Sequence, residues 1–244
     1  MKTTMKKAAA FGAVALFTCT GAFAGSITGK IVYEGEVPPV LSKPVDVSSD
    51  PQCVHHTEGK PVLNEILVLG EGQTMANIIV KVIKGLPDKE WPVPEEPYKM
   101  TQEGCKYSPH VNVVRLGQTL YVMNPDQIFH NVNCAPKENT PQNRAMPANV
   151  RVIEFTFDKL EPEPFRFKCD VHPWMMAYCA VLDHPFYDIT ETDGVFTIEN
   201  LEPGEYEIEA WHERLGTQTA TVTVTADAPA VANFTFTRDS AKKG

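Results

Sequence analysis

The sequence predicts an all-β protein. Three observations favour this fold class: short segments alternate between apolar and polar residues, proline and glycine are frequent (20 and 15 of 244 residues), and helical periodicity is almost absent. Alternation with a period of two residues is typical of strands that bury one face, and proline and glycine end such strands at turns. We therefore expect β-sheets packed on one another as β-sandwiches.

Residues 1–24 have the pattern of a secretory signal peptide. Three lysines occur in the first seven residues, Ala8–Phe17 forms an apolar core, and Ala22–Ala24 supplies the small residues of a cleavage site. The apolar core is too short to span a bilayer. We expect cleavage after Ala24 and an exported protein, periplasmic or secreted, with no membrane span.

The charge of the remaining chain is strongly negative. Removing residues 1–24 takes away three lysines and no acidic residue, so the formal net charge moves from -9 to -12. So acidic a chain argues against nucleic acid as a ligand and favours a partner with a basic surface, because charge steers encounter. The roughly 220 residues that remain can form one large or two small domains.

The first part of this chain contains three predicted strands. Gly25–Tyr33 alternates regularly, and the apolar runs Ile66–Leu69 and Ile78–Ile83 are joined by a turn at residues 70–72. Residues 38–61 are rich in proline, serine and aspartate, and we expect an ordered loop there. Residues 87–97 hold four prolines and predict an extended linker.

Turn signals separate alternating strands near the C-terminal end. Asp193-Gly194 precedes the strand at 195–198, and Pro203-Gly204 precedes the strand at 205–211, which together predict a hairpin. With Gly25–Tyr33 as its opening strand, this pattern resembles the carboxypeptidase regulatory-like (transthyretin-like) β-sandwich. The resemblance is structural and brings no catalytic residue.

The centre of the chain holds four side chains of the types that bind copper. Cys169, His172 and Met175 are spaced three residues apart, and His130 lies 39 positions upstream of Cys169. A thiolate, two imidazoles and a thioether are typical of a type 1 copper site, because soft sulfur favours Cu(I) and imidazole tolerates Cu(II). One short loop can hold the first three ligands, and His130 follows an apolar strand at 120–124 and a turn.

The motif Cys-x2-His-Pro-x-Met, together with the upstream His-Asn-Val, resembles the small blue copper proteins (cupredoxins), and the short loop is most similar to the amicyanin type. Position by position, the resemblance places the four copper ligands at His130, Cys169, His172 and Met175, with Met175 favoured over Met176 as the axial ligand. It covers roughly residues 104–183 and implies a Greek-key β-sandwich with one copper ion.

The resemblance also implies a function and a domain plan. A cupredoxin transfers single electrons, here to a redox partner such as a c-type cytochrome or a periplasmic dehydrogenase. His172 would be the exit route at the surface, with Pro173, Trp174 and Met176 as the contact surface. The copper segment at 104–183 would be inserted into, or packed as one body with, a split sandwich formed by residues 25–100 and 186–237, followed by a tail at 238–244.

Other interpretations stay open. Cys169 could belong to a disulfide, with His172 and Met175 as packing residues, or the set could bind zinc, although zinc needs no methionine. A copper carrier would use the same ligands, and a structural module would bind no metal. A copper enzyme such as a nitrite reductase would normally need a second site, which only His55, His56 and His110 could supply. We expect no enzyme, because no catalytic constellation is evident.

Five cysteines follow the signal segment. If Cys169 is a ligand, the other four can form two disulfides, and the sequence allows three pairings. We favour Cys53 with Cys105 and Cys134 with Cys179, since Cys134 lies just after His130 and Cys179 just after the copper loop. Two further histidines, His184 and His212, are expected to be hydrogen-bonded structural residues, and Glu213-Arg214 a surface pair.

Overall fold

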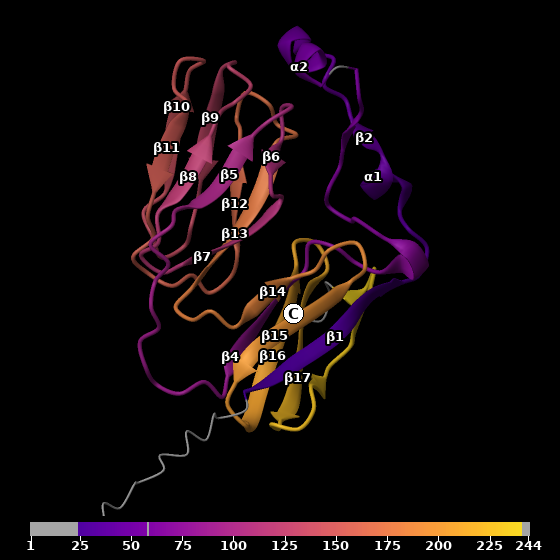
Figure 1. Ribbon diagram of the computed structural model, residues 1–244. Coiled ribbons are helices and arrows are strands. Elements are labelled where there is room, and N and C mark those ends of the chain that lie inside the picture. The colour runs from indigo at the N-terminus through magenta and orange to yellow at the C-terminus, as the bar shows by residue number, and fades with distance from the viewer. Residues whose placement is uncertain (1–23, 58, 241–244) are drawn as a thin grey trace, which may run out of the picture.

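The computed structural model describes residues 24–57 and 59–240, and within them the chain is almost entirely β, which confirms the predicted fold class (Figure 1). The helices in these residues are short: α1 (Pro39–Ser42), α2 (Pro51–His56) and the 3-10 turn η1 (Glu71–Gln73). No helix in the described part of the chain is long and apolar enough to cross a membrane. The predicted signal segment lies outside the described residues except for Ala24, as do the last four residues of the predicted tail.

The middle of the chain forms one β-sandwich, which we call the central sandwich. Its five-stranded sheet has the order β10-β9-β12-β13-β7, and its four-stranded sheet the order β11-β8-β5-β6. The inner faces of both sheets share one apolar core. The strands are β5 (Tyr98–Gln102), β6 (Tyr107–Ser108), β7 (Val111–Arg115), β8 (Leu120–Met123), β9 (His130–Cys134), β10 (Gln142–Met146), β11 (Val152–Phe155), β12 (Phe165–Lys168) and β13 (Met176–Leu182).

Strands from both sides of this segment pair with one another in a second pair of sheets, the flanking sandwich. β1 pairs with β15, β18 and β19, and the other sheet has the order β14-β4-β16-β17. Gly29 of β1 is required here, because a Cβ would lie 1.6 Å from the carbonyl oxygen of Ala232. The strands are β1 (Gly25–Glu34), β4 (Ile79–Lys84), β14 (Tyr187–Ile189), β15 (Val195–Leu201), β16 (Gly204–His212), β17 (Gly216–Val224), β18 (Ala230–Val231) and β19 (Phe234–Thr237).

A small third core joins the two sandwiches. Alternate residues of β7 and β13 point away from the central core and pack on Ile79 of β4 and Trp211 of β16. β7 is therefore buried on both faces, which explains why its sequence, Val-Asn-Val-Val-Arg, does not alternate.

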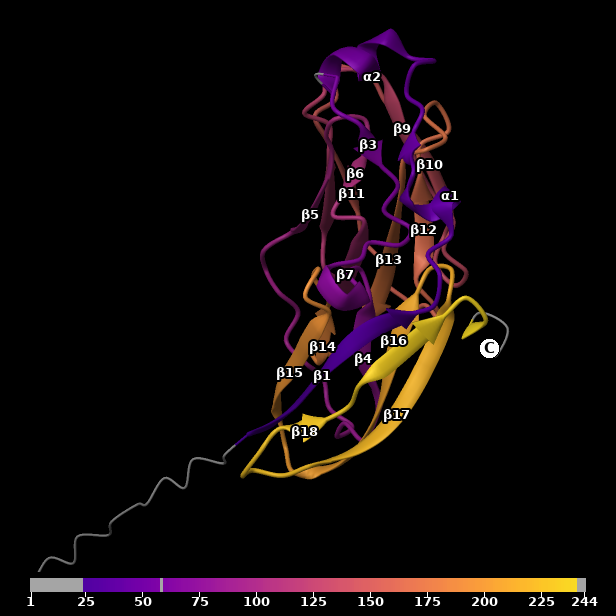
Figure 2. The same ribbon diagram turned by 90° about the vertical axis from the view of Figure 1, so that its right-hand side faces the viewer.

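Residues 36–57 and 59–69 form an arm that leaves β1 and lies along the central sandwich, with α2 near the end that is far from the flanking sandwich (Figure 2). The arm contains α1, α2 and a two-stranded ribbon, β2 (Pro44–Val45) with β3 (Val62–Leu63). A disulfide between Cys53 of α2 and Cys105 holds it to the central sandwich. The segment predicted as an ordered loop, residues 38–61, is thus held by the disulfide that was predicted at Cys53.

Two local predictions are wrong. Residues 66–69 form no strand beyond an isolated bridge between Leu69 and Met75, although Ile66 and Leu67 are buried. A short apolar run is compatible with any buried segment, so its periodicity does not identify a strand. The predicted hairpin at 192–211 is also absent, because β15 and β16 lie in different sheets. The Pro203-Gly204 turn carries the chain from one sheet to the other.

Candidate metal centre

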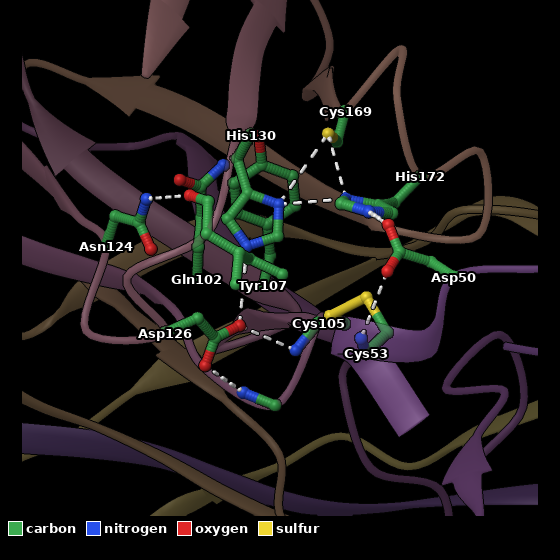
Figure 3. Close-up of polar contacts among 12 residues, drawn as sticks. Asp50, Cys53, Gln102, Cys105, Tyr107, Asn124, Asp126, His130, Cys169 and His172 are labelled. Atoms are coloured by element: carbon green, nitrogen blue, oxygen red, sulfur yellow. Dashed lines mark hydrogen bonds and ion pairs between the residues drawn. A yellow bond between two sulfur atoms is a disulfide. The ribbon is translucent and has the colours of Figure 1, made fainter. Parts of the chain in front are cut away.

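Three of the four predicted ligands converge at one end of the central sandwich (Figure 3). His130 is the first residue of β9, and Cys169 and His172 lie in the loop between β12 and β13. The two Nδ1 atoms are 2.9 Å apart, and Sγ of Cys169 lies 3.9 Å from Nδ1 of His130 and 3.7 Å from Nδ1 of His172. All three side chains are at most 1% exposed.

Met175 closes the loop that carries two of these side chains. Its N–H donates to the carbonyl of His172 (2.9 Å), and its carbonyl accepts from the N–H of Cys169 (3.1 Å). The Met175 side chain is fully buried in the same core as Cys169, whereas Met176 is half-buried beside His110 and Trp174. These positions agree with Met175 as the axial candidate, and its ligand role stays a prediction.

Asparagine amides hold the loop against β9 and β10. Asn131 Oδ1 accepts from the N–H of Asp170 at 2.6 Å and lies 3.4 Å from Sγ of Cys169. The Oδ2 atom of Asp170 accepts from the amides of Asn131, Asn133 and Asn143 at 2.8–2.9 Å. The Lys168 ammonium and these amides hold the pKa of Asp170 well below its usual range. The residue after Cys169 is therefore fixed in place.

Each of the two histidines also contacts a carboxylate on its far side. Nε2 of His130 lies 3.3 Å from Oδ2 of Asp126, and Nε2 of His172 lies 3.0 Å from Oδ2 of Asp50. A carboxylate only accepts, so Nε2 of each ring donates to its carboxylate, and Nδ1 is the ring nitrogen that faces Cys169. This pattern of an outer acceptor on a ligand histidine is common at metal sites.

The surroundings of the cluster shift its protonation. Burial alone would raise the pKa of Cys169, but hydrogen bonds from His130 and His172 lower it to about 6. Burial alone would lower the pKa of His130, but its hydrogen bonds to Asp126 and Cys169 outweigh burial and raise it. The pKa of His172 is raised in the same way, against burial, by Cys169 and Asp50. The thiolate, which is the metal-binding form of cysteine, is thus favoured at neutral pH.

The donor set fits copper. One thiolate and two imidazoles in a buried site, with a methionine on the same loop, match the donor types of a type 1 centre. Structural zinc takes four Cys or His ligands, and the group His130, Cys169 and His172 has no fourth within the described residues. The other two clusters found there include Cys53 or Cys105, whose sulfurs are bonded to each other.

The sequence did not reveal either outer carboxylate. Asp126 lies in the Asn-Pro-Asp turn four residues before His130, so its proximity could have been noticed. Asp50 is 122 residues from His172, and no local pattern connects the two.

The predicted surface exposure of His172 is wrong. The side chain is 1% exposed because Asp50 covers Nε2 and the Trp174 ring packs against the imidazole, with centroids 5.3 Å apart. Trp174 itself donates from Nε1 to the carbonyl of Cys105 (3.0 Å). Of the predicted contact surface, Pro173 is exposed, while Trp174 and Met176 are half-buried.

One of the two predicted disulfides is confirmed. Cys53 and Cys105 are bonded, whereas Cys134 and Cys179 are free and buried. Strand β12 lies between β9, which carries Cys134, and β13, which carries Cys179, so their Cα atoms are about 9.5 Å apart or more. A disulfide needs Cα atoms within about 7 Å. Burial raises the pKa of Cys134 to about 11, so this thiol stays protonated.

The remaining histidine predictions have mixed outcomes. His184 and His212 are structural, since each Nδ1 accepts backbone N–H groups. Glu213 is not at the surface: its side chain is 3% exposed, and Oε1 lies 2.6 Å from Nε2 of His110. The other ring nitrogen of His110, Nδ1, lies 3.2 Å from the carbonyl oxygen of Met176. The described residues contain no metal-ligand group that combines His110 with the two histidines of α2, so the second site is not formed.

Comparisons with known proteins identify no family for the chain. No family model matches the sequence, and no curated protein matches it. Among solved structures, the chain is similar to a purple cupredoxin from Nitrosopumilus maritimus (18% identity, 34% of this chain and 98% of that chain, TM-score 0.29). It is also similar to amicyanin from Paracoccus versutus (22% identity, 42% of this chain and 96% of that chain, TM-score 0.31).

A third similar structure is a copper-containing nitrite reductase from Thermus scotoductus (15% identity, TM-score 0.33). This match covers 63% of the present chain but only 28% of the nitrite reductase. At these identities and TM-scores the similarities carry no information on activity or ligands.

Proposed function

We propose that this protein is a type 1 copper protein that carries single electrons between redox partners outside the cytoplasm. The observation that supports the proposal best is the convergence of two imidazole Nδ1 atoms and one thiolate in a buried site within 4.8 Å of one another. His130, Cys169 and His172 would hold the ion, with Met175 as the axial ligand. Bound copper would supply a one-electron couple between Cu(II) and Cu(I).

The protein's own residues keep this donor set rigid. His130 is held by β9, and its Nε2 proton is held by Asp126. Cys169 and His172 lie on a loop that is tied to β9 and β10 through Asp170, and His172 is tied to the arm through Asp50. Ligand atoms held in this way move little when the charge of the bound metal changes. Such small movement favours fast electron transfer over catalysis. We therefore propose a carrier and not an enzyme.

The proposed partners follow from charge and compartment. A formal net charge of -9 for the whole chain, or -12 without the proposed signal segment, favours a redox partner with a basic surface. We propose that this partner is a c-type cytochrome or a periplasmic dehydrogenase.

The test of copper binding is the visible absorption and EPR spectrum of the disulfide-intact protein with one equivalent of Cu(II). We expect a strong thiolate-to-copper band with narrow copper hyperfine splitting, which ascorbate bleaches. Cys169→Ser removes the thiolate and should abolish the band while the fold is retained.

Cys134→Ser is the matched control, because Cys134 is also a free, buried thiol of the same core but lies outside the ligand group. Its copper spectrum should equal that of the wild type. A colourless wild-type complex, or a band that survives in Cys169→Ser, would refute the assignment. A colourless complex that binds Zn(II) stoichiometrically would instead support a zinc site.

A copper carrier is the second candidate, and burial of the site argues against it. Metal exchange between proteins needs access to a ligand, and His172 is covered. Incubation of the copper-loaded protein with an apo acceptor distinguishes the two functions. Rapid transfer to the acceptor would favour the carrier.

A further inference from the structure

Asp50 makes two separate sets of contacts. Its Oδ1 atom accepts from the N–H groups of Gln52 (2.8 Å) and Cys53 (3.3 Å) and so caps the N-terminus of α2. Its Oδ2 atom points the other way and accepts from Nε2 of His172 at 3.0 Å (Figure 3). The carboxylate therefore joins the arm to the loop that carries two of the proposed ligands.

A covalent bond holds this carboxylate in place. Three residues after Asp50, Cys53 is bonded to Cys105, and both cysteines are fully buried. The N–H of Cys105 donates to Oδ2 of Asp126 (2.8 Å), the carboxylate that contacts His130. The disulfide thus links the segment that supplies Asp50 to a residue that hydrogen-bonds the outer carboxylate of His130.

We propose that Asp50 is a positioning residue of the copper centre, which orients His172, closes its outer edge to solvent and lowers the reduction potential of the bound metal. This inference rests on the proposed function of the same site. It assigns to the arm a role in the metal centre, although the arm provides no proposed ligand.

The orienting role follows from the hydrogen bond itself. With the proton of His172 directed to Asp50, only one ring tautomer and one ring rotation place Nδ1 opposite Cys169. Outer partners of this kind typically change metal affinity about 10- to 100-fold when they are removed.

The closing role follows from burial. A ligand histidine in a short loop at the end of a sandwich presents its Nε2 edge to solvent unless another segment covers it. Here the imidazole is 1% exposed, while the Asp50 side chain that covers it is 27% exposed. Release of the metal past this edge would require His172 to turn outward and to break its hydrogen bond with Asp50.

The effect on potential has a definite sign. A carboxylate that accepts the Nε2 proton makes the imidazole a stronger donor and adds negative charge near the metal. Both effects stabilise the doubly charged Cu(II) more than Cu(I). Loss of the Asp50 charge should therefore raise the reduction potential.

The experiment compares Asp50→Asn with Asp46→Asn in the copper-loaded protein. Asn is a good N-cap, so α2 can keep its start, but the amide offers N–H groups where His172 needs an acceptor. Asp46 lies on the same arm, accepts from the N–H of Ser48 and belongs to no metal-ligand group within the described residues. Both variants remove one negative charge from the arm, so a general charge effect would appear equally in both.

Two readouts are measured: the reduction potential by voltammetry, and the rate at which the Cu(I) protein loses metal to bathocuproine disulfonate. We expect Asp50→Asn to raise the potential and to accelerate metal loss about 10- to 100-fold, with Asp46→Asn close to the wild type. Asp50→Ser, which can still cap α2 but is too short to reach His172, should behave like Asp50→Asn.

Equal potentials and equal loss rates in the Asp50 and Asp46 variants would overturn the proposal. If Asp50→Asn does not fold, as judged by circular dichroism, Asp50→Ser decides by the same two readouts. Failure of the proposed function is visible separately, because the wild-type protein would then lack the thiolate-to-copper band before any variant is compared.

Discussion

At the scale of single residues, His212 shows how burial controls protonation in this protein. The side chain is 3% exposed at the end of β16, and its Nδ1 accepts from the N–H groups of Arg214 and Leu215, each at 3.1 Å. Burial lowers the pKa of His212 to about 4. The neutral imidazole therefore organises the turn between β16 and β17.

This lowered pKa predicts a loss of stability in acid. An unfolded histidine has a pKa near 6.5, so below that pH the unfolded chain binds more protons than the folded one. The free energy of unfolding should fall from about pH 6.5 and level off below about pH 4, with a contribution from His212 of about 2 kcal/mol between pH 7 and pH 5. Urea denaturation at both pH values measures the loss.

The matched variant is His212→Asn, whose Oδ1 can accept from the same N–H groups but does not titrate. It should lose about 2 kcal/mol less than the wild type on acidification. An identical loss in both proteins would show that His212 is not the group responsible.

At the scale of elements, the arm depends on its disulfide. α2 has only six residues, too few to be stable alone, and of these only Cys53 is buried. The arm packs on the central sandwich through few side chains, among them Val47 and Cys53. The covalent bond to Cys105 is thus the strongest single restraint on the segment that carries Asp50.

Replacing both Cys53 and Cys105 by serine should release the arm. The bond closes a loop with a sequence separation of 52, for which chain entropy alone corresponds to about 4 kcal/mol. We expect rapid proteolytic cleavage within residues 36–69 while the strands of both sandwiches persist. Limited proteolysis with mass spectrometry measures this.

Cys134→Ser serves as the comparison, because it alters a buried free thiol without touching the arm. Its cleavage pattern should match that of the wild type. Equal protection of the arm in the disulfide variant would mean that noncovalent packing holds it.

At the scale of the whole molecule, the two sandwiches are coupled through the core between them. Trp211 of β16 packs beside Tyr178 of β13, with ring centroids 5.4 Å apart, among the outward residues of β7 and β13. The buried pair of His110 and Glu213 crosses the same junction. Apolar packing and a buried His–Glu hydrogen bond thus connect the central sandwich to the flanking sandwich.

Trp211→Ala should weaken this coupling. Replacing a buried tryptophan with alanine lowers the free energy of unfolding by about 3–5 kcal/mol. Because Trp211 is buried between the two sandwiches, this loss should weaken the contact between them. We expect one thermal unfolding transition in the wild type and two in the variant, measured by calorimetry. Trp91→Ala is the control, because Trp91 packs on Phe186 in the core of the flanking sandwich. Two transitions in the control, or one in Trp211→Ala, would contradict the prediction.

Local patterns were sufficient for part of the fold and of the site. Alternation predicted β1, an apolar run predicted β4, and the strand and turn before His130 were also correct. The spacing of Cys169 and His172 was enough to predict that both lie on one loop, and a strand that ends in a turn predicted where His130 would join them. The strands and turns could be predicted because they depend on residues that are close in the sequence. The candidate site could be predicted because its residue types themselves indicate which atoms can bind a metal.

The sequence by itself thus determined the all-β class and the residue types that meet in the candidate site. Only the tertiary structure decided how that site is enclosed. Asp50 contacts His172 at a sequence separation of 122 residues, and Glu213 contacts His110 at a separation of 103 residues. Strand β12 lies between the strands that carry Cys134 and Cys179 and so prevents a disulfide between them. Such contacts depend on which strands become neighbours and on the path of the arm. Both are set by the packing of the whole chain, and no local pattern of residues carries them.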